Sequence, residues 1–226
     1  MDVSILDVLG PVMIGPSSSH TAGALRLARA ARAIYGKPFD RVVFELHGSF
    51  ARTGVGHGTD RALLAGVLGL QATDPRIRDS YALADARGLS FSFRESDLGE
   101  VHENTCRITF YEDGGGFCVT GCSVGGGSIT VMDINGTTVD ISGDLPTLVV
   151  RQQDRKGVLS AVTSLLAARD INIGVLRLSR DAKGATATTV IETDNALPAD
   201  IRAALLALPN ILDVTIIDLD AEATDV

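Results

Sequence analysis

Hydrophobic and polar positions alternate most regularly in the second half of the chain. Alternating β-branched residues predict four strands, at residues 147–152, 171–180, 185–194 and 212–220. Residues 155–170 carry hydrophobic side chains at helical spacing, and Pro198, whose fixed φ suits a first helical turn, predicts the start of a second helix. The predicted order is β-α-β-β-α-β over about 80 residues, which is a ferredoxin-like unit.

The first half mixes helices with strands and glycine-rich turns. Residues 21–36 form a predicted helix with one hydrophobic face. The opposite face carries Arg26, Arg29 and Arg32, which we interpret as a solvated face or as a contact for an acidic partner. A second helix is predicted at residues 59–70. Strands are predicted at residues 39–49, 89–96, 106–112 and 128–134. This mixture indicates an α+β domain.

A polar stretch separates the two halves. Gly143, Asp144 and Pro146 interrupt the hydrophobic pattern there, as residues of turns and linkers do. We therefore expect two domains, at residues 1–143 and 146–226.

The composition favours a soluble globular protein of the cytoplasm. The 226 residues have a net charge of -8, and 45% of them are hydrophobic. Acidic residues outnumber basic ones by 28 to 20, which argues against a nucleic-acid partner, because phosphate backbones attract basic surfaces. The longest hydrophobic run, residues 62–70, is shorter than the roughly 20 residues that span a bilayer, and nothing at the start resembles a leader peptide. Three cysteines (Cys106, Cys118 and Cys122) are an odd number, so we expect buried, unpaired thiols.

The segment IGPSSSHTAG places hydroxyl groups and a histidine ahead of the first predicted helix. Ser17, Ser18 and Ser19 can cap that helix, and their hydroxyls together with its unpaired N–H groups make a cradle for an anion such as a carboxylate. One serine is enough for a cap, so three serines followed by His20 and Thr21 exceed that need. The simpler alternative is a set of capping serines beside a surface histidine.

A glycine-rich stretch surrounds a second histidine. Gly56 and Gly58 flank His57, in what we interpret as a loop of bare backbone ahead of the next helix, with Thr59 or Asp60 as the cap. The spacing departs from the G-x-G-x-x-G dinucleotide fingerprint at its last glycine, so we expect no nucleotide site. His57 is then either held where it meets a ligand or is an ordinary surface histidine.

A third cluster, in the segment VHENTCR, lies ahead of a predicted strand. It brings together His102, Glu103 and Asn104. A histidine beside a carboxylate can act as a general base, but adjacent residues in an extended segment point to opposite faces. Asn104 can equally be a turn residue, and the segment SVGGGS predicts a further turn.

Four segments, GPSSSHTAGALRLA, GSFARTGVGHGTDRALLAG, HEN and SVGGGS, occur in a distinctive order and spacing. In this they resemble the β portion of the iron-sulfur-dependent L-serine dehydratases. The predicted β-α-β-β-α-β unit, with DRKGVLSAV at its first strand-to-helix junction and DINI entering its second strand, resembles an ACT domain. The resemblance covers the whole chain, because the separate β subunit of the two-chain enzymes ends in an ACT domain.

The resemblance implies a fold and a role for the chain. An α+β domain of the serine dehydratase β type would be followed by a ferredoxin-like ACT domain. The chain would be one subunit of an L-serine ammonia-lyase, which converts L-serine to pyruvate and ammonia. A partner α subunit would carry the 4Fe-4S cluster and its cysteines, so this chain would hold no metal and would be inactive alone.

The ACT domain carries a further expectation. ACT domains typically pair edge to edge and bind an amino acid or an ion at the seam, which implies self-association and an effector site near Asp154 and Gly157. Gly157 would let a ligand approach the backbone, where a helix N-terminus offers free N–H groups. The alternative is a module that dimerises and binds nothing.

The resemblance also assigns roles to individual residues. The implied substrate-binding residues are Ser17, Ser18, Ser19, Thr21, Gly56, Gly58, Asp60 and Asn104. His57 or His20 would act as base or proton relay, because imidazole, with a pKa of about 6.5, accepts protons near neutral pH, and His102 is a third candidate. His47 has no motif role and is expected to be structural. Thr105 departs from the family, which often has glycine after HEN, and this affects the local turn.

Two alternative functions stay open. The first domain is similar to the allosteric substrate-binding domain of some phosphoglycerate dehydrogenases, so the chain can instead be a serine-sensing module that catalyses nothing. An ACT protein that serves as an interaction scaffold is the other alternative. The full set of SSSHT, GHGTD and HEN, on a chain with no dehydrogenase attached, favours the dehydratase.

Overall fold

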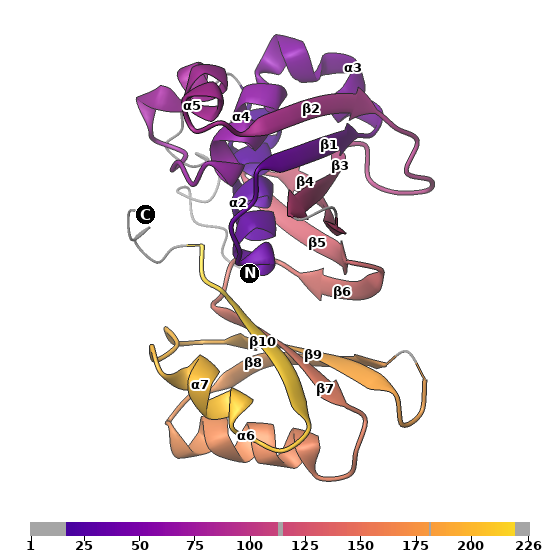
Figure 1. Ribbon diagram of the computed structural model, residues 1–226, viewed down its shortest axis with the longest axis vertical. Coiled ribbons are helices and arrows are strands. Elements are labelled where there is room, and N and C mark those ends of the chain that lie inside the picture. The colour runs from indigo at the N-terminus through magenta and orange to yellow at the C-terminus, as the bar shows by residue number, and fades with distance from the viewer. Residues whose placement is uncertain (1–16, 113–114, 181, 220–226) are drawn as a thin grey trace, which may run out of the picture. The chain divides into compact units, whose positions relative to one another are not determined.

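The computed structural model describes residues 17–112, 115–180 and 182–219 and shows two compact units (Figure 1). The first unit ends at Gly136 and the second begins at Thr137. The domain boundary expected at residues 143–146 falls in the connection between two strands, β6 (Thr137–Ile141) and β7 (Thr147–Gln153), and stays a prediction.

The first unit is α+β, as predicted. It begins with a π-helical turn, η1 (Ser18–Gly23), which runs directly into α2 (Ala24–Tyr35). The remaining helices and turns are α3 (Gly48–His57), α4 (Thr59–Val67), η2 (Pro75–Asp79) and α5 (Ser80–Ala86). The strands are β1 (Arg41–Leu46), β2 (Ser90–Glu95), β3 (Thr105–Glu112), β4 (Gly115–Gly125) and β5 (Ser128–Ile134).

The strands of the first unit lie in the order β2-β1-β3-β4-β5. The β1–β2 pair is parallel, and the pairs from β1 through β3 and β4 to β5 are antiparallel. Strand β4 was not predicted, because its glycines and small residues have low strand propensity. One of them, Gly121, is required by packing: a Cβ there would lie 2.6 Å from Leu27 Cδ1 of α2.

Close helix packing in this unit depends on a second glycine. At Gly66 of α4, a Cβ would lie 2.4 Å from the carbonyl oxygen of Leu25 and 2.6 Å from Ala28 Cβ, both on α2. The hydrophobic face of α2 is buried, as its pattern predicted, and includes Leu27 and Ala31 with no exposed surface. The two helices therefore pack almost backbone to backbone.

The arginine face of α2 is less solvated than predicted. Arg29 Nη1 donates to Gln71 Oε1 at 2.7 Å, and the guanidinium of Arg32 lies directly against Gly69. Gly69 has a φ of 89° and follows the end of α4, so the chain turns back over this face and half-buries the arginines. The hydrophobic period of α2 alone carries no information about that later segment.

The glycine-rich stretch predicted to be a loop is helical as far as His57. The helix N-terminus of α3 is capped by a distant carbonyl, since the N–H groups of Ser49 and Phe50 donate to the oxygen of Glu103 at 2.7 and 3.3 Å. Gly48, with a φ of 51°, allows this approach, because a Cβ there would lie 2.8 Å from the same oxygen. These contacts offset the roughly 1 kcal/mol that each helical glycine costs.

The second unit has the predicted ferredoxin-like fold. After β7 come α6 (Val158–Ala168), β8 (Ile173–Arg180), β9 (Thr186–Thr193), α7 (Ile201–Leu206) and β10 (Ile211–Ile217). The strands form an antiparallel sheet in the order β10-β7-β9-β8. Leu148, Val162, Leu166, Ile191 and Ile201 lie in its core with no exposed surface. Across the described parts of both units, no helix has the length and apolar character needed to cross a membrane.

Candidate active site

The serine-rich opening forms the start of the site. Ser17 has an extended backbone, with a φ of -141°, and its Oγ accepts a hydrogen bond from the His20 N–H at 3.2 Å, so it is a helix cap as predicted. In the wide π-helical turn that follows, Gly23 packs closely against Ser123 of β4. A Cβ at Gly23 would lie only 2.0 Å from Ser123 Oγ. Residues 14–16 of the motif lie outside the described residues.

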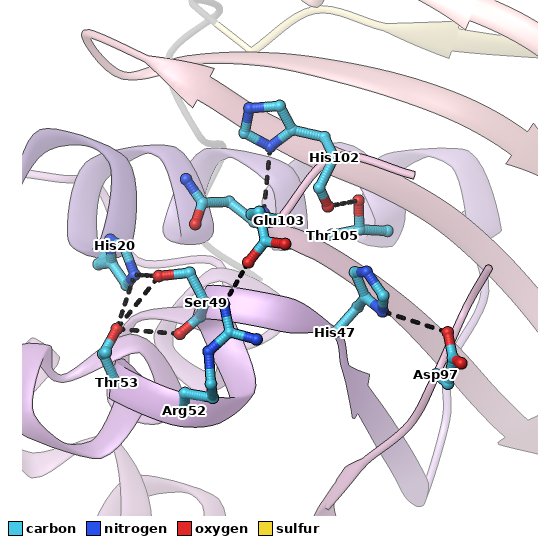
Figure 2. A network of polar contacts seen from close by, with 10 residues as sticks. His20, His47, Ser49, Arg52, Thr53, Asp97, His102, Glu103 and Thr105 are labelled. Carbon is cyan, nitrogen blue, oxygen red and sulfur yellow. Dashed lines mark hydrogen bonds and ion pairs between the residues drawn. The ribbon is translucent and has the colours of Figure 1, made fainter. Parts of the chain in front are cut away.

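The imidazole of His20 contacts hydroxyl groups on both ring nitrogens, and Figure 2 shows the contacts of Nε2 with Ser49 and Thr53. Ser19 Oγ lies 3.2 Å from Nδ1. On the other side, Ser49 Oγ and Thr53 Oγ1 lie 3.2 and 3.1 Å from Nε2. Ser49 and Thr53 were not among the predicted site residues, although their spacing of four residues places two side chains on one face of a helix.

His57 lies beside His20. The two ring centroids are 5.0 Å apart, and Thr21 Oγ1 donates to the backbone oxygen of His57 at 3.2 Å. Burial lowers the pKa of His20, the nearby charge of His57 lowers it further, and a hydrogen bond with the backbone of Ser49 opposes both effects. His20 is therefore neutral at pH 7, while the more exposed ring of His57 faces solvent.

The HEN segment forms a turn ahead of β3, which agrees with the turn role left open for Asn104. Its Glu103 carbonyl caps α3, and the Glu103 side chain forms an ion pair with Arg52 (Figure 2). His102 Nδ1 accepts from the Asn104 N–H at 3.1 Å, and Thr105 Oγ1 donates to the His102 oxygen at 2.6 Å. The turn thus fixes the helix that carries Ser49, Thr53 and His57.

Asn104 reaches toward the same region as the opening segment. Its Nδ2 donates to the backbone oxygen of Ser123 at 3.5 Å, and Ser123 is the residue that packs on Gly23. Within the part of the chain that the structure describes, buried Asn104 Oδ1 and Ser123 Oγ have no hydrogen-bond partner. Two unpaired buried oxygens are costly, and a ligand donor would satisfy them.

The predicted cap residues of α4 have other contacts. Among the described residues no side chain caps this helix, whose N-cap is Gly58 with a φ of 71°. Thr59 is buried, and Asp60 accepts a hydrogen bond from the Tyr81 hydroxyl at 2.5 Å. The expectation that Thr59 or Asp60 caps α4 is wrong, because a left-handed glycine ends α3 and starts α4 without a side-chain cap.

The structure brings together only some of the predicted residues. Ser17, Ser19, His20, Thr21 and His57 share one set of contacts. Ser18 lies half-buried in η1, and open space surrounds Gly56 and Gly58. His102 bonds within its own turn, and His47 Nδ1 accepts from the Leu98 N–H at 3.2 Å, a backbone contact of structural character.

The expected effector loop has an engaged carboxylate. Asp154 Oδ2 accepts hydrogen bonds from the Gly184 N–H at 2.9 Å and from Arg180 Nη1 at 3.3 Å. Both contacts lower the pKa of Asp154, and the Gly184 bond has the larger effect. Gly157, with a φ of 88°, stands in open space at the start of α6. An effector site here stays a prediction.

The three cysteines do not fit an iron-sulfur cluster. Cys106 has no exposed surface and Cys122 has 3%, and burial raises the pKa of both thiols, whereas cluster ligands are thiolates. Cys118 is half-buried, less than predicted, and all three described cysteines are unpaired. Among the described residues no three His, Cys, Asp or Glu side chains are grouped as metal ligands.

Fold and site together define a class: a two-unit protein in which a histidine-and-hydroxyl site on an α+β unit precedes a ferredoxin-like unit. The family model described as "Serine dehydratase beta chain" matches residues 4–86, and the model described as "ACT domain" matches residues 146–210. The probable L-serine dehydratase, beta chain, of Bacillus subtilis is 41% identical over 94% of this chain and 96% of its own length. The L-serine dehydratase, beta chain, of Peptoniphilus asaccharolyticus is 40% identical over 92% and 94%. The chain belongs to the family of L-serine dehydratase β chains, as the motifs predicted.

A weaker similarity concerns the regulatory alternative. The D-3-phosphoglycerate dehydrogenase of Mycobacterium leprae is 26% identical over 61% of this chain and 26% of its own length. This lower identity and shorter match favour the dehydratase.

Proposed function

We propose that this chain is the β subunit of an L-serine ammonia-lyase and that it supplies substrate-binding and proton-transfer groups to an active site shared with an α subunit. The observation that carries the proposal is the convergence of two histidines and three hydroxyls, from Ser19, Ser49 and Thr53, at the motifs that define the family. Relatives named L-serine dehydratase beta chain along nearly the whole length support it.

The proposed division of labour follows from the chemistry of serine. Elimination of water needs a base for the α proton, and a neutral imidazole can take it. His20 is neutral and His57 is in ring contact with it, so these two form the proton-transfer pair. The η1 turn with Ser17, Ser18 and Thr21 offers hydroxyl and N–H groups to the substrate carboxylate.

The remaining parts of the proposal concern partners. The α subunit holds the 4Fe-4S cluster, because the buried thiols of this chain do not fit one. Asn104 Oδ1, an unpaired buried acceptor, suits a substrate donor such as the ammonium group. The ferredoxin-like unit self-associates and takes an effector beside Gly157. The complex works in the cytoplasm, where the unpaired thiols stay reduced.

The test is anaerobic pyruvate formation from L-serine by this chain and its cluster-bearing α subunit. We expect His57→Ala to lower kcat about 100-fold or more, the range of a general acid–base group, with assembly intact. Lys37→Ala, at an exposed position outside the motifs, is the control and should retain activity.

Two results would contradict the proposal. If His57→Ala keeps its kcat and only the serine dependence shifts, the chain is a regulator. If the wild-type pair with a verified cluster makes no pyruvate, the assigned reaction is wrong.

A further inference from the structure

The hydroxyl of Thr53 contacts both the backbone oxygen of Ser49 and a ring nitrogen of His20. Thr53 Oγ1 donates to the backbone oxygen of Ser49 at 2.9 Å. A hydroxyl has a single proton, so the same oxygen can only accept at its 3.1 Å contact with His20 Nε2. Nε2 must then be the N–H of the imidazole.

The other ring nitrogen is consequently an acceptor. In a neutral imidazole with Nε2–H, the Nδ1 atom has a free lone pair, and Ser19 Oγ at 3.2 Å donates to it. Ser17 Oγ lies 3.4 Å from Ser19 Oγ and can donate in turn. The hydrogen bonds therefore run in one direction, from Ser17 through Ser19, His20 and Thr53 to the carbonyl of Ser49 (Figure 2 shows its last three members).

We infer that Thr53 is a positioning residue that holds His20 as its Nε2–H tautomer, so that Nδ1 is the proton-accepting atom and the Ser19 hydroxyl is its relay. A proton reaches Nδ1 when Ser19 Oγ passes on its own proton and takes one from the donor. Two protons move, one from Ser19 Oγ to Nδ1 and one from the donor to Oγ, so the net transfer is one proton and Oγ is a hydroxyl before and after. The lowered pKa of His20 supports the inference, because only a neutral ring has this tautomer choice.

The geometry explains why hydroxyl residues stand on both sides of His20. Thr53 lies one helical turn after Ser49 on α3, so its hydroxyl is oriented by the helix backbone itself. Ser49 Oγ, at 3.2 Å from Nε2 and 3.4 Å from Thr53 Oγ1, shares the same nitrogen. The role of this tautomer in catalysis rests on the proposed function. The assignment of the tautomer does not depend on that function.

The tautomer is measured by ¹⁵N NMR of the His20 ring in the full-length chain, without a partner. We expect a protonated Nε2 and an unprotonated Nδ1 in the wild type. Thr53→Val replaces the hydroxyl by a methyl group and should shift population to the Nδ1–H form, whereas Thr53→Ser should restore the wild-type signals. A wild type with protonated Nδ1 overturns the inference, and this result needs no variant to fold. A Thr53→Val chain with unchanged signals overturns it as well.

The catalytic consequence is read in the complex with the α subunit. Thr53→Val should lower kcat about tenfold or more while KM for serine changes less, and Thr53→Ser should recover most of the rate. An altered tautomer with an unchanged kcat overturns the relay. A wild-type complex that makes no pyruvate contradicts the proposed function and leaves the NMR result standing.

Discussion

At the scale of single residues, the site is defined by what surrounds one imidazole. His20 is buried enough for its pKa to fall, and its neighbour His57 adds a like charge when protonated. A folded-state pKa below the unfolded value means that the unfolded chain binds more protons near pH 6. The contribution of His20 to the free energy of unfolding is therefore present above its unfolded pKa and is lost as pH falls toward its folded pKa.

One prediction follows for these two histidines. His57→Asn removes the neighbouring charge, so the pKa of His20 should rise, yet it should stay below its ordinary value because burial is the larger cause. The measurement is an NMR titration of the His20 ring in the full-length chain. His47→Asn is the control, because His47 is absent from the causes of this shift, and it should leave the titration unchanged. A His20 pKa that does not move in His57→Asn would show that the rings are not in contact.

At the scale of elements, helices in the first unit are placed by contacts remote in sequence. Glu103 caps α3 through its carbonyl, and Gly66 and Gly121 let α2 approach α4 and β4. Sequence reasoning found α2, α4 and most strands, since their hydrophobic periods are local. It missed α3, because glycine-rich helices have weak propensity and the cap that stabilises this one comes from another loop.

Two helical glycines test this packing. Gly66→Ala should destabilise the chain by about 2 kcal/mol or more, because the new Cβ would collide with the backbone oxygen of Leu25. Gly56→Ala is the matched change, and since space around Gly56 is open it should be neutral or stabilising by up to about 1 kcal/mol. Urea unfolding of the two variants gives the comparison. Equal effects would argue against close contact of α2 and α4.

In the molecule as a whole, each of the two units has its own buried hydrophobic residues. The core of the second unit includes Leu148, Leu166 and Ile191, all without exposed surface. A unit of this size with a continuous hydrophobic core between one sheet and two helices has what independent folding requires.

We therefore predict that residues 137–226 fold as an isolated fragment. Circular dichroism should show mixed α and β structure with a cooperative thermal transition. Leu166→Ala should destabilise the fragment by about 2–5 kcal/mol, the range for a fully buried leucine, whereas the exposed Ser164→Ala should change little. A fragment without a cooperative transition would contradict the prediction.

The ferredoxin-like second unit, the α+β class of the first unit and the family could all be predicted from the sequence, because hydrophobic periods and motif order are properties of neighbouring residues. The sequence also identified His20 and His57 as candidates. The folded chain was needed to show that Ser49 and Thr53 reach His20, that Asp60 accepts a hydrogen bond from Tyr81, and that the arginine face of α2 is half-buried. Those contacts join residues 20 or more positions apart, so the distances that decide hydrogen bonding and burial arise only when the chain is folded.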